Sequence, residues 1–126
     1  MWPFAETVDP DKVAIHLDFW GDAAAPSFTV KLVAENQTVL EGFGEIRDTD
    51  FRLCNIKTDP AYRQRGFGTT VVGTLIGAAR ARRCATFTLE DVSPANTEAI
   101  AVYQSFGAVA LPPKKVGGHA DYQLTL

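Results

Sequence analysis

Segment 59–70 holds the residues best suited to bind a charged ligand. Gly66 and Gly68 carry no side chain that would block an anion, and they stand where a strand pattern gives way to a helix pattern. The first amides of a helix lack an internal acceptor and carry the positive end of the helix dipole, so they favour an anion. Arg63 and Arg65 add guanidinium groups, whose shape suits two phosphate oxygens. These residues favour a diphosphate ligand, and a tight turn with exposed arginines is the alternative.

Two other phosphate-binding loops do not fit the same segment. The dinucleotide fingerprint requires three glycines and an acidic residue about 20 positions further on. The nucleoside triphosphate loop ends in Gly-Lys-Ser or Gly-Lys-Thr. Neither pattern is present, so both of these ligand classes are disfavoured.

The elements around the glycine turn indicate an α/β (α+β) fold. Alternating apolar residues predict strands, and apolar residues at helical spacing predict helices. Strands are expected at about 13–20, 28–34, 38–47, 51–58, 85–92, 109–111 and 122–126, and helices at about 66–83 and 96–106. The chain should therefore form a sheet of about seven strands with two main helices, the first of which opens at the glycine turn.

Length and composition restrict the fold and the partners. The 126 residues, 46% apolar and 21% charged, fit one folded domain over 1–126. A net charge of -3 gives no general attraction to nucleic acid. No apolar run reaches the length of a membrane span and the N-terminus lacks signal-peptide features, so a cytoplasmic protein without membrane contact is expected. Cys54, Cys84, His16 and His119 lack metal-ligand spacing, so no metal is expected and both cysteines are interpreted as plain thiols.

Two motifs in the second half of the chain occur in the order of a known family. Segment 55–68 has the form of a strand followed by (Gln/Arg)-x-x-Gly-x-(Gly/Ala), and segment 92–107 has the form Val-x-x-x-Asn-x-x-Ala-Ile-x-x-Tyr-x-x-x-Gly. Both resemble the GNAT superfamily of acetyl-CoA-dependent N-acyltransferases, and segment 119–124 resembles that family's last strand. The resemblance covers 51–126. It implies a GNAT-like mixed, mostly antiparallel sheet and an enzyme that transfers an acetyl group from acetyl-CoA to a primary amine by direct attack on the thioester.

The resemblance also implies a role for individual residues. It assigns pantetheine contacts to Asn96 and to the backbone around Ile56 and Thr58, and it makes Tyr103 the acid that protonates the departing thiolate. It assigns the diphosphate of acetyl-CoA to Arg63, Arg65, and the amides of Gly66, Phe67, Gly68, Thr69 and Thr70. Asn96 and Tyr103 share a helix face and lie about 10 Å apart along it. A helix cap and a core tyrosine are the alternative for this pair.

The general base is where the sequence departs from the family. Many members carry Glu early in the fourth strand, where this chain has Arg52, which cannot accept a proton. The resemblance implies that Glu90 and Asp91 on the fifth strand lie next to the cleft, and they are the catalytic candidates. The family's acidic position falls on Asp91, and a bulge could present either one. Glu45 is an outside candidate, and a water-relayed base or no base at all stays open.

A second departure concerns the acceptor side. The helices that usually lie between the family's first two strands are reduced or absent, because only segment 21–26 is available. Those helices usually form a wall of the amine pocket, so we expect an open acceptor side. That favours a protein or peptide acceptor, or a small amine in a pocket completed by a homodimer. A catalytically silent acyl-CoA-binding module is the alternative to an enzyme, and a structural protein would bind no cofactor.

Overall fold

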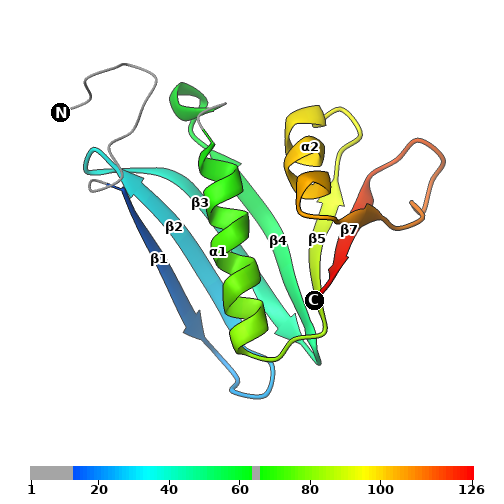
Figure 1. The fold of residues 1–126 in the computed structure, drawn as a ribbon, viewed down its shortest axis with the longest axis horizontal. Coiled ribbons are helices and arrows are strands. Elements are labelled where there is room, and N and C mark those ends of the chain that lie inside the picture. The colour runs from blue at the N-terminus through cyan, green and yellow to red at the C-terminus, as the bar shows by residue number, and fades with distance from the viewer. Residues whose placement is uncertain (1–12, 64–65) are drawn as a thin grey trace.

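The structure is a computed structural model that describes residues 13–63 and 66–126. Its centre is one sheet with seven strands in the order β1-β2-β3-β4-β5-β7-β6 (Figure 1). Only β4 and β5 pair in parallel, and all other neighbours are antiparallel. The elements are β1 (Val13–Trp20), β2 (Ser27–Ala34), β3 (Gln37–Arg47), β4 (Asp50–Thr58), the short 3₁₀ turn η2 (Pro60–Tyr62), α1 (Phe67–Ala81), β5 (Thr86–Val92), α2 (Thr97–Ser105), β6 (Val109–Ala110) and β7 (Ala120–Thr125). The predicted fold class is confirmed.

The first four strands form an antiparallel meander with short connections. Segment 21–26 links β1 to β2 as a turn, in which the Ala25 amide donates to the Asp22 carbonyl at 3.1 Å. The expected loss of helices at this point is therefore confirmed. Glu35 and Asn36 have φ of 53° and 63°, as a two-residue hairpin turn requires, so β3 begins one residue before the predicted start.

The last strands differ from their predicted bounds. β7 begins at Ala120, two residues before the predicted Tyr122, because Ala120 pairs with Val92 beyond an irregularity in β5. β6 contains only Val109 and Ala110, and Pro112 and Pro113, which lack an amide donor, follow soon after. These shifts leave the order of the elements as predicted.

One face of the sheet carries the core and both helices (Figure 1). Phe51 of β4 lies between Phe28 of β2 and Phe87 of β5 in the core, with its ring centroid 4.6 Å from that of Phe28 and 5.7 Å from that of Phe87. α1 buries its apolar residues on this face: Val71, Val72, Leu75, Ile76 and Ala79. No helix within the described residues is long and apolar enough to cross a membrane.

The opposite side of the sheet has no helix over it in the described part of the chain. We call it the open face. Strand alternation and the cross-strand pairs Thr29↔Phe43 and Glu45↔Arg52 place Trp20, Thr29, Phe43, Glu45 and Arg52 on it. Trp20 and Phe43 are both more than half exposed there.

A bulge in β4 separates its two halves. Phe43 pairs with Asn55, whereas the next residue of β3, Gly44, pairs with Leu53, so Cys54 is the extra residue. A Cβ at Gly44 would overlap the Arg52 carbonyl and lie 2.6 Å from the Phe28 ring, so only glycine fits opposite the bulge. Parallel pairing with β5 ends beside the bulge, at Leu53↔Leu89.

Candidate active site

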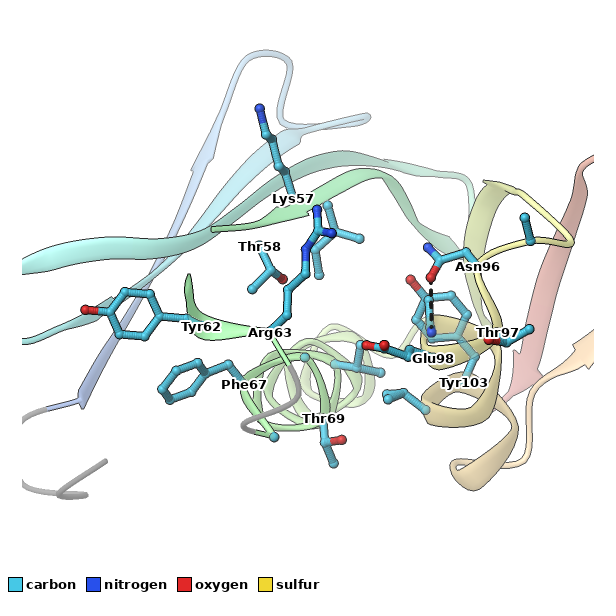
Figure 2. Close-up of a pocket in the computed structure, with 17 residues that line it drawn as sticks. Lys57, Thr58, Tyr62, Arg63, Phe67, Thr69, Asn96, Thr97, Glu98 and Tyr103 are labelled. Atoms are coloured by element: carbon cyan, nitrogen blue, oxygen red, sulfur yellow. Dashed lines mark hydrogen bonds between the residues drawn. The ribbon is translucent and has the colours of Figure 1, made fainter. Parts of the chain in front are cut away.

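A pocket of about 450 Å³ lies on the helical side, where β4, the N-terminus of α1 and the N-terminus of α2 meet (Figure 2). Segments far apart in sequence contribute to it, because β4 and β5 diverge beyond Leu53↔Leu89 and α2 follows the separated end of β5 (Figure 1). Its lining contains most of the predicted cofactor-binding residues: Ile56, Thr58, Arg63, Gly66, Phe67, Gly68, Thr69 and Asn96, with the predicted acid Tyr103.

The N-terminus of α1 presents backbone amides to this pocket. Gly66 caps the helix with φ 80°, a left-handed conformation that glycine adopts without strain. The Phe67, Gly68 and Thr69 amides donate to no backbone acceptor within the described residues. A Cβ at Gly68 would meet nothing within 4 Å, so the space beside these amides is open. The arrangement suits an anion.

The Thr70 amide differs from the other amides that are predicted to bind the diphosphate. It donates to the Gly66 carbonyl at 3.1 Å, and the Thr70 hydroxyl donates to the same oxygen at 3.1 Å. Thr70 is also absent from the pocket lining. The first hydrogen bond of the helix already uses this amide, so the structure favours the Phe67, Gly68 and Thr69 amides over that of Thr70 as donors to a ligand.

The structure describes only one of the two arginines that are predicted to bind the diphosphate. Arg63 lies in the pocket, and Figure 2 shows its guanidinium beside Lys57 and Thr58 of β4, away from Thr69. This long side chain would therefore have to rotate to reach a diphosphate at the N-terminus of α1. Arg65 lies outside the described residues.

Ile56 and Thr58 lie on the half of β4 that has left β5. The edge of β4 that faces β5 has no strand partner beyond Leu53 in the described structure. An extended ligand can hydrogen-bond to that edge of backbone, as a further strand would.

Asn96 and Tyr103 reach the same pocket from α2. The Asn96 side-chain carbonyl accepts from the Ala99 amide at 3.3 Å and so caps the helix, while Figure 2 shows its amide nitrogen on the pocket side. Tyr103 is buried, with its ring 6.2 Å from that of Tyr122. Burial raises the pKa of the Tyr103 phenol. Asn96 therefore caps α2 and Tyr103 packs in the core, and both residues also line the pocket.

Glu90 lies where β4 and β5 part, on the side of the open face. Its Oε2 accepts from Arg52 Nε at 2.7 Å and from Cys54 Sγ at 3.3 Å. Its Oε1 accepts no hydrogen bond within the described chain, so one oxygen of the carboxylate is fixed and the other is available. Neither Glu90 nor Asp91 is among the residues that line the pocket.

Asp91 faces away from this point. It has φ 57° at the irregularity in β5, and its side chain is 79% exposed. Its carboxylate lies 3.2 Å from His119 Nδ1, and its amide donates to Asp121 at 2.9 Å. The bulge anticipated in β5 is present, and it directs the two acidic side chains to different surroundings.

Arg52 connects three strands. It forms ion pairs with Asp50 at 2.6 Å, Glu90 at 2.7 Å and Asp121 at 3.2 Å. Burial disfavours its charge, but hydrogen bonds and charges from Glu90 and Asp50 outweigh burial and raise the pKa of Arg52. The residue that replaces the family's Glu therefore holds the candidate base.

Cys54, Glu45 and Glu90 form a cluster that the sequence did not reveal. One ligand atom from each lies within 4.8 Å of the others, close enough for a metal ion. Burial and the Glu90 carboxylate raise the pKa of Cys54 to about 11, so its thiol stays protonated. Arg47 pairs with Glu45 and Arg52 pairs with Glu90, which favours ion pairs with arginine over metal coordination. Gly42 and Gly44 are the sequence feature that could have indicated this cluster, because glycine inside a strand often marks a bulge.

Several solved structures share this fold. The PaiA N-acetyltransferase of Thermoplasma acidophilum, in complex with coenzyme A, is 13% identical with a TM-score of 0.70, over 79% of this chain and 61% of that one. A ribosomal-protein alanine N-acetyltransferase from Escherichia coli is 24% identical with a TM-score of 0.65, over 82% and 68%. A GNAT family acetyltransferase from Elizabethkingia anophelis with acetyl-CoA bound is 12% identical with a TM-score of 0.70, over 92% and 99%. This chain thus spans about three fifths of the Thermoplasma protein and nearly all of the Elizabethkingia protein.

The sequence comparisons address the family directly. No curated protein sequence matches the chain significantly. A model of the acetyltransferase (GNAT) family matches residues 1–108, which is most of the chain. Together with the seven-stranded sheet and the glycine turn at α1, this match shows that the chain belongs to the acetyltransferase (GNAT) family.

Proposed function

We propose that this protein transfers an acetyl group from acetyl-CoA to a primary amine. The observation that carries the proposal is the pocket that joins the amides at the start of α1 to the point where β4 and β5 separate. Two of the structurally similar proteins hold coenzyme A or acetyl-CoA, which supports this ligand. We expect the diphosphate at one end of the pocket and the thioester at the other.

The cofactor is bound mainly by backbone amides and by arginine side chains. The amides of Phe67, Gly68 and Thr69 donate to the diphosphate, and Arg63 and Arg65 add charge. The pantetheine arm extends along the free edge of β4 at Ile56 and Thr58, opposite the Asn96 carboxamide. This placement fixes the thioester near the bulge, and such positioning can contribute about 7 to 11 kcal/mol to lowering the barrier.

The transfer itself needs one attack and two proton movements. The lone pair of the amine forms a bond to the thioester carbon, and the carbon–sulfur bond breaks to release the thiolate of coenzyme A. A backbone amide of β4 near the bulge donates to the carbonyl oxygen as negative charge develops there. The Tyr103 hydroxyl then protonates the thiolate.

Tyr103 is a weak acid for this task. Burial raises the pKa of its phenol, whereas an ordinary thiol has a pKa of about 8.5. Proton donation is therefore uphill and is coupled to departure of the sulfur. In return, the hydroxyl keeps its proton across the physiological range, so the donor is always present.

Glu90 is the stronger candidate for the base. Its free Oε1 lies on the open face beside the bulge, whereas Asp91 is directed toward His119 and solvent. The amine passes its proton to Glu90 as the new bond forms. The ion pair with Arg52 holds the Glu90 carboxylate at this position.

Calorimetry with acetyl-CoA, followed by a turnover assay on a panel of amines, tests the proposal. We expect saturable binding and the release of free thiol that depends on the amine. Binding without turnover would identify a silent acyl-CoA-binding module, and a lack of binding would contradict the whole proposal. Thermal shift with acetyl-CoA provides an independent check, since a ligand that binds only the folded state raises the melting temperature.

A further inference from the structure

The open face carries two large aromatic side chains in solvent. Trp20 is 57% exposed and Phe43 is 51% exposed. They flank Thr29, which accepts from Trp20 Nε1 at 3.2 Å and is the cross-strand partner of Phe43. We call Trp20, Thr29 and Phe43 the aromatic patch. Exposed aromatic rings on a rigid sheet are typical of contact surfaces, because they offer apolar area at low entropic cost.

The aromatic patch is continuous with the proposed catalytic point. Phe43 and Glu45 lie two residues apart on one side of β3, and the Glu45 carboxylate lies within 4.8 Å of the Cys54 sulfur and the Glu90 carboxylate. Two strand spacings separate β3 from β5, which places Phe43 about 10 Å from Glu90. An extended peptide covers that distance in about three residues.

The charge between these two points suits an amine. Glu45 and Glu90 bring two carboxylates close together, and each is held by an arginine, Arg47 for Glu45 and Arg52 for Glu90. Glu90 Oε1 has no hydrogen bond within the described chain. Because Arg52 also pairs with two further carboxylates, four carboxylates face two arginines here, and the excess negative charge attracts an ammonium group. No helix of the described residues lies across its approach on the open face.

We infer that the open face binds the N-terminus of an extended peptide as the acetyl acceptor. The α-amine lies at Glu45 and Glu90, and an apolar side chain near the third residue packs on Phe43 and Trp20. This inference rests on the proposed acetyl transfer and adds the acceptor class and its specificity. A small amine has no such side chain and cannot contact the aromatic patch.

Two synthetic tetrapeptides test the inference, Ala-Ala-Leu-Ala and Ala-Ala-Ser-Ala, each with a free α-amine and an amidated C-terminus. The wild-type kcat/KM should favour the leucine peptide about tenfold. Phe43→Ala should reduce that preference to about twofold or less, and Phe43→Leu should restore part of it. Val116→Ala, which removes an exposed apolar side chain from the β6–β7 loop, serves as the control and should keep the preference.

The outcomes separate this inference from the proposed function. Turnover of both peptides without a preference overturns the inference and leaves acetyl transfer intact. Tight binding of the leucine peptide without acetylation, seen by calorimetry in the presence of coenzyme A, supports the docking surface and contradicts the enzyme. A dimer in light scattering that Phe43→Lys converts to a monomer shows that a second copy covers the patch, and this also overturns the inference. Melting curves check that each variant is folded.

Discussion

The two sides of the sheet have different proposed roles, and they use different chemical groups for them. The helical side offers backbone amides at the start of α1 and a free edge of β4, so its proposed contacts with acetyl-CoA come from main-chain geometry. The open face offers side chains from β1, β3, β4 and β5, and the proposed base Glu90 is held there by Arg52. Changes at the α1 amides should therefore alter cofactor binding, and changes on the open face should alter the acceptor and its proton.

The largest effect should come from Glu90. Glu90→Gln keeps the shape of the side chain but removes the proton acceptor, so kcat with a peptide amine should fall about 10³-fold. Binding of acetyl-CoA, measured by calorimetry, should stay within about twofold of the wild type because Glu90 lies outside the pocket lining.

Asp91→Asn is the matched comparison. Because Asp91 is exposed and directed toward His119, its loss should change kcat by less than about threefold. A larger loss with Asp91→Asn than with Glu90→Gln would assign the base to Asp91.

Tyr103→Phe should have the next largest effect. It removes the hydroxyl that protonates the thiolate, so kcat should fall about 10²-fold with acetyl-CoA affinity nearly unchanged. The kcat profile should show no loss from Tyr103 below about pH 10, because burial raises the pKa of the phenol. The same shift predicts that the contribution of Tyr103 to stability falls as pH rises above about 10, where the unfolded chain loses its proton first. A large loss of binding with unchanged kcat would contradict the assigned role.

A smaller effect, confined to the cofactor, should follow from Gly68→Val. The branched side chain would occupy the open space beside the α1 amides, so acetyl-CoA affinity should fall about tenfold or more. Arg63→Ala should weaken binding by a comparable factor, and Arg80→Ala at the other end of α1 is the control of equal charge. Equal effects of Arg63→Ala and Arg80→Ala would indicate general charge attraction without a specific site.

The smallest expected effect concerns Cys54. Its pKa of about 11 should make alkylation by iodoacetamide at pH 8 slower than that of a free thiol. In Glu90→Gln the rate should rise several-fold, because the negative charge that favours the protonated thiol is removed. Mass spectrometry of the Cys54 peptide distinguishes it from Cys84, and an unchanged rate would show that Glu90 does not control this thiol.

The two sides also differ in how far the sequence predicts them. The glycine turn, Asn96 and Tyr103 lie in continuous motifs, so the family resemblance could assign them to one ligand, and all three line the same pocket. The sequence does not show that the first hydrogen bond of α1 uses the Thr70 amide, because that bond depends on where Gly66 caps the helix. Strand and helix order followed from hydrophobic periodicity, whereas the exact start of β7 depended on a partner in β5.

The open face could not be anticipated in the same way. Arg52, Cys54 and Glu90 meet only because a bulge in β4 faces the end of its pairing with β5, and no local pattern encodes that distance. The sequence identifies Arg52 only as a departure from the family's pattern, whereas its ion pairs with three carboxylates depend on the folded sheet.

The central claim is that the amides at the start of α1 bind the diphosphate of coenzyme A. Amide NMR spectra recorded during a titration with coenzyme A, and in parallel with pantetheine, which lacks the diphosphate, test it most directly. We predict large shifts of the Phe67, Gly68 and Thr69 amide signals with coenzyme A and small ones with pantetheine. Saturable binding of coenzyme A that leaves these three signals in place would contradict the claim.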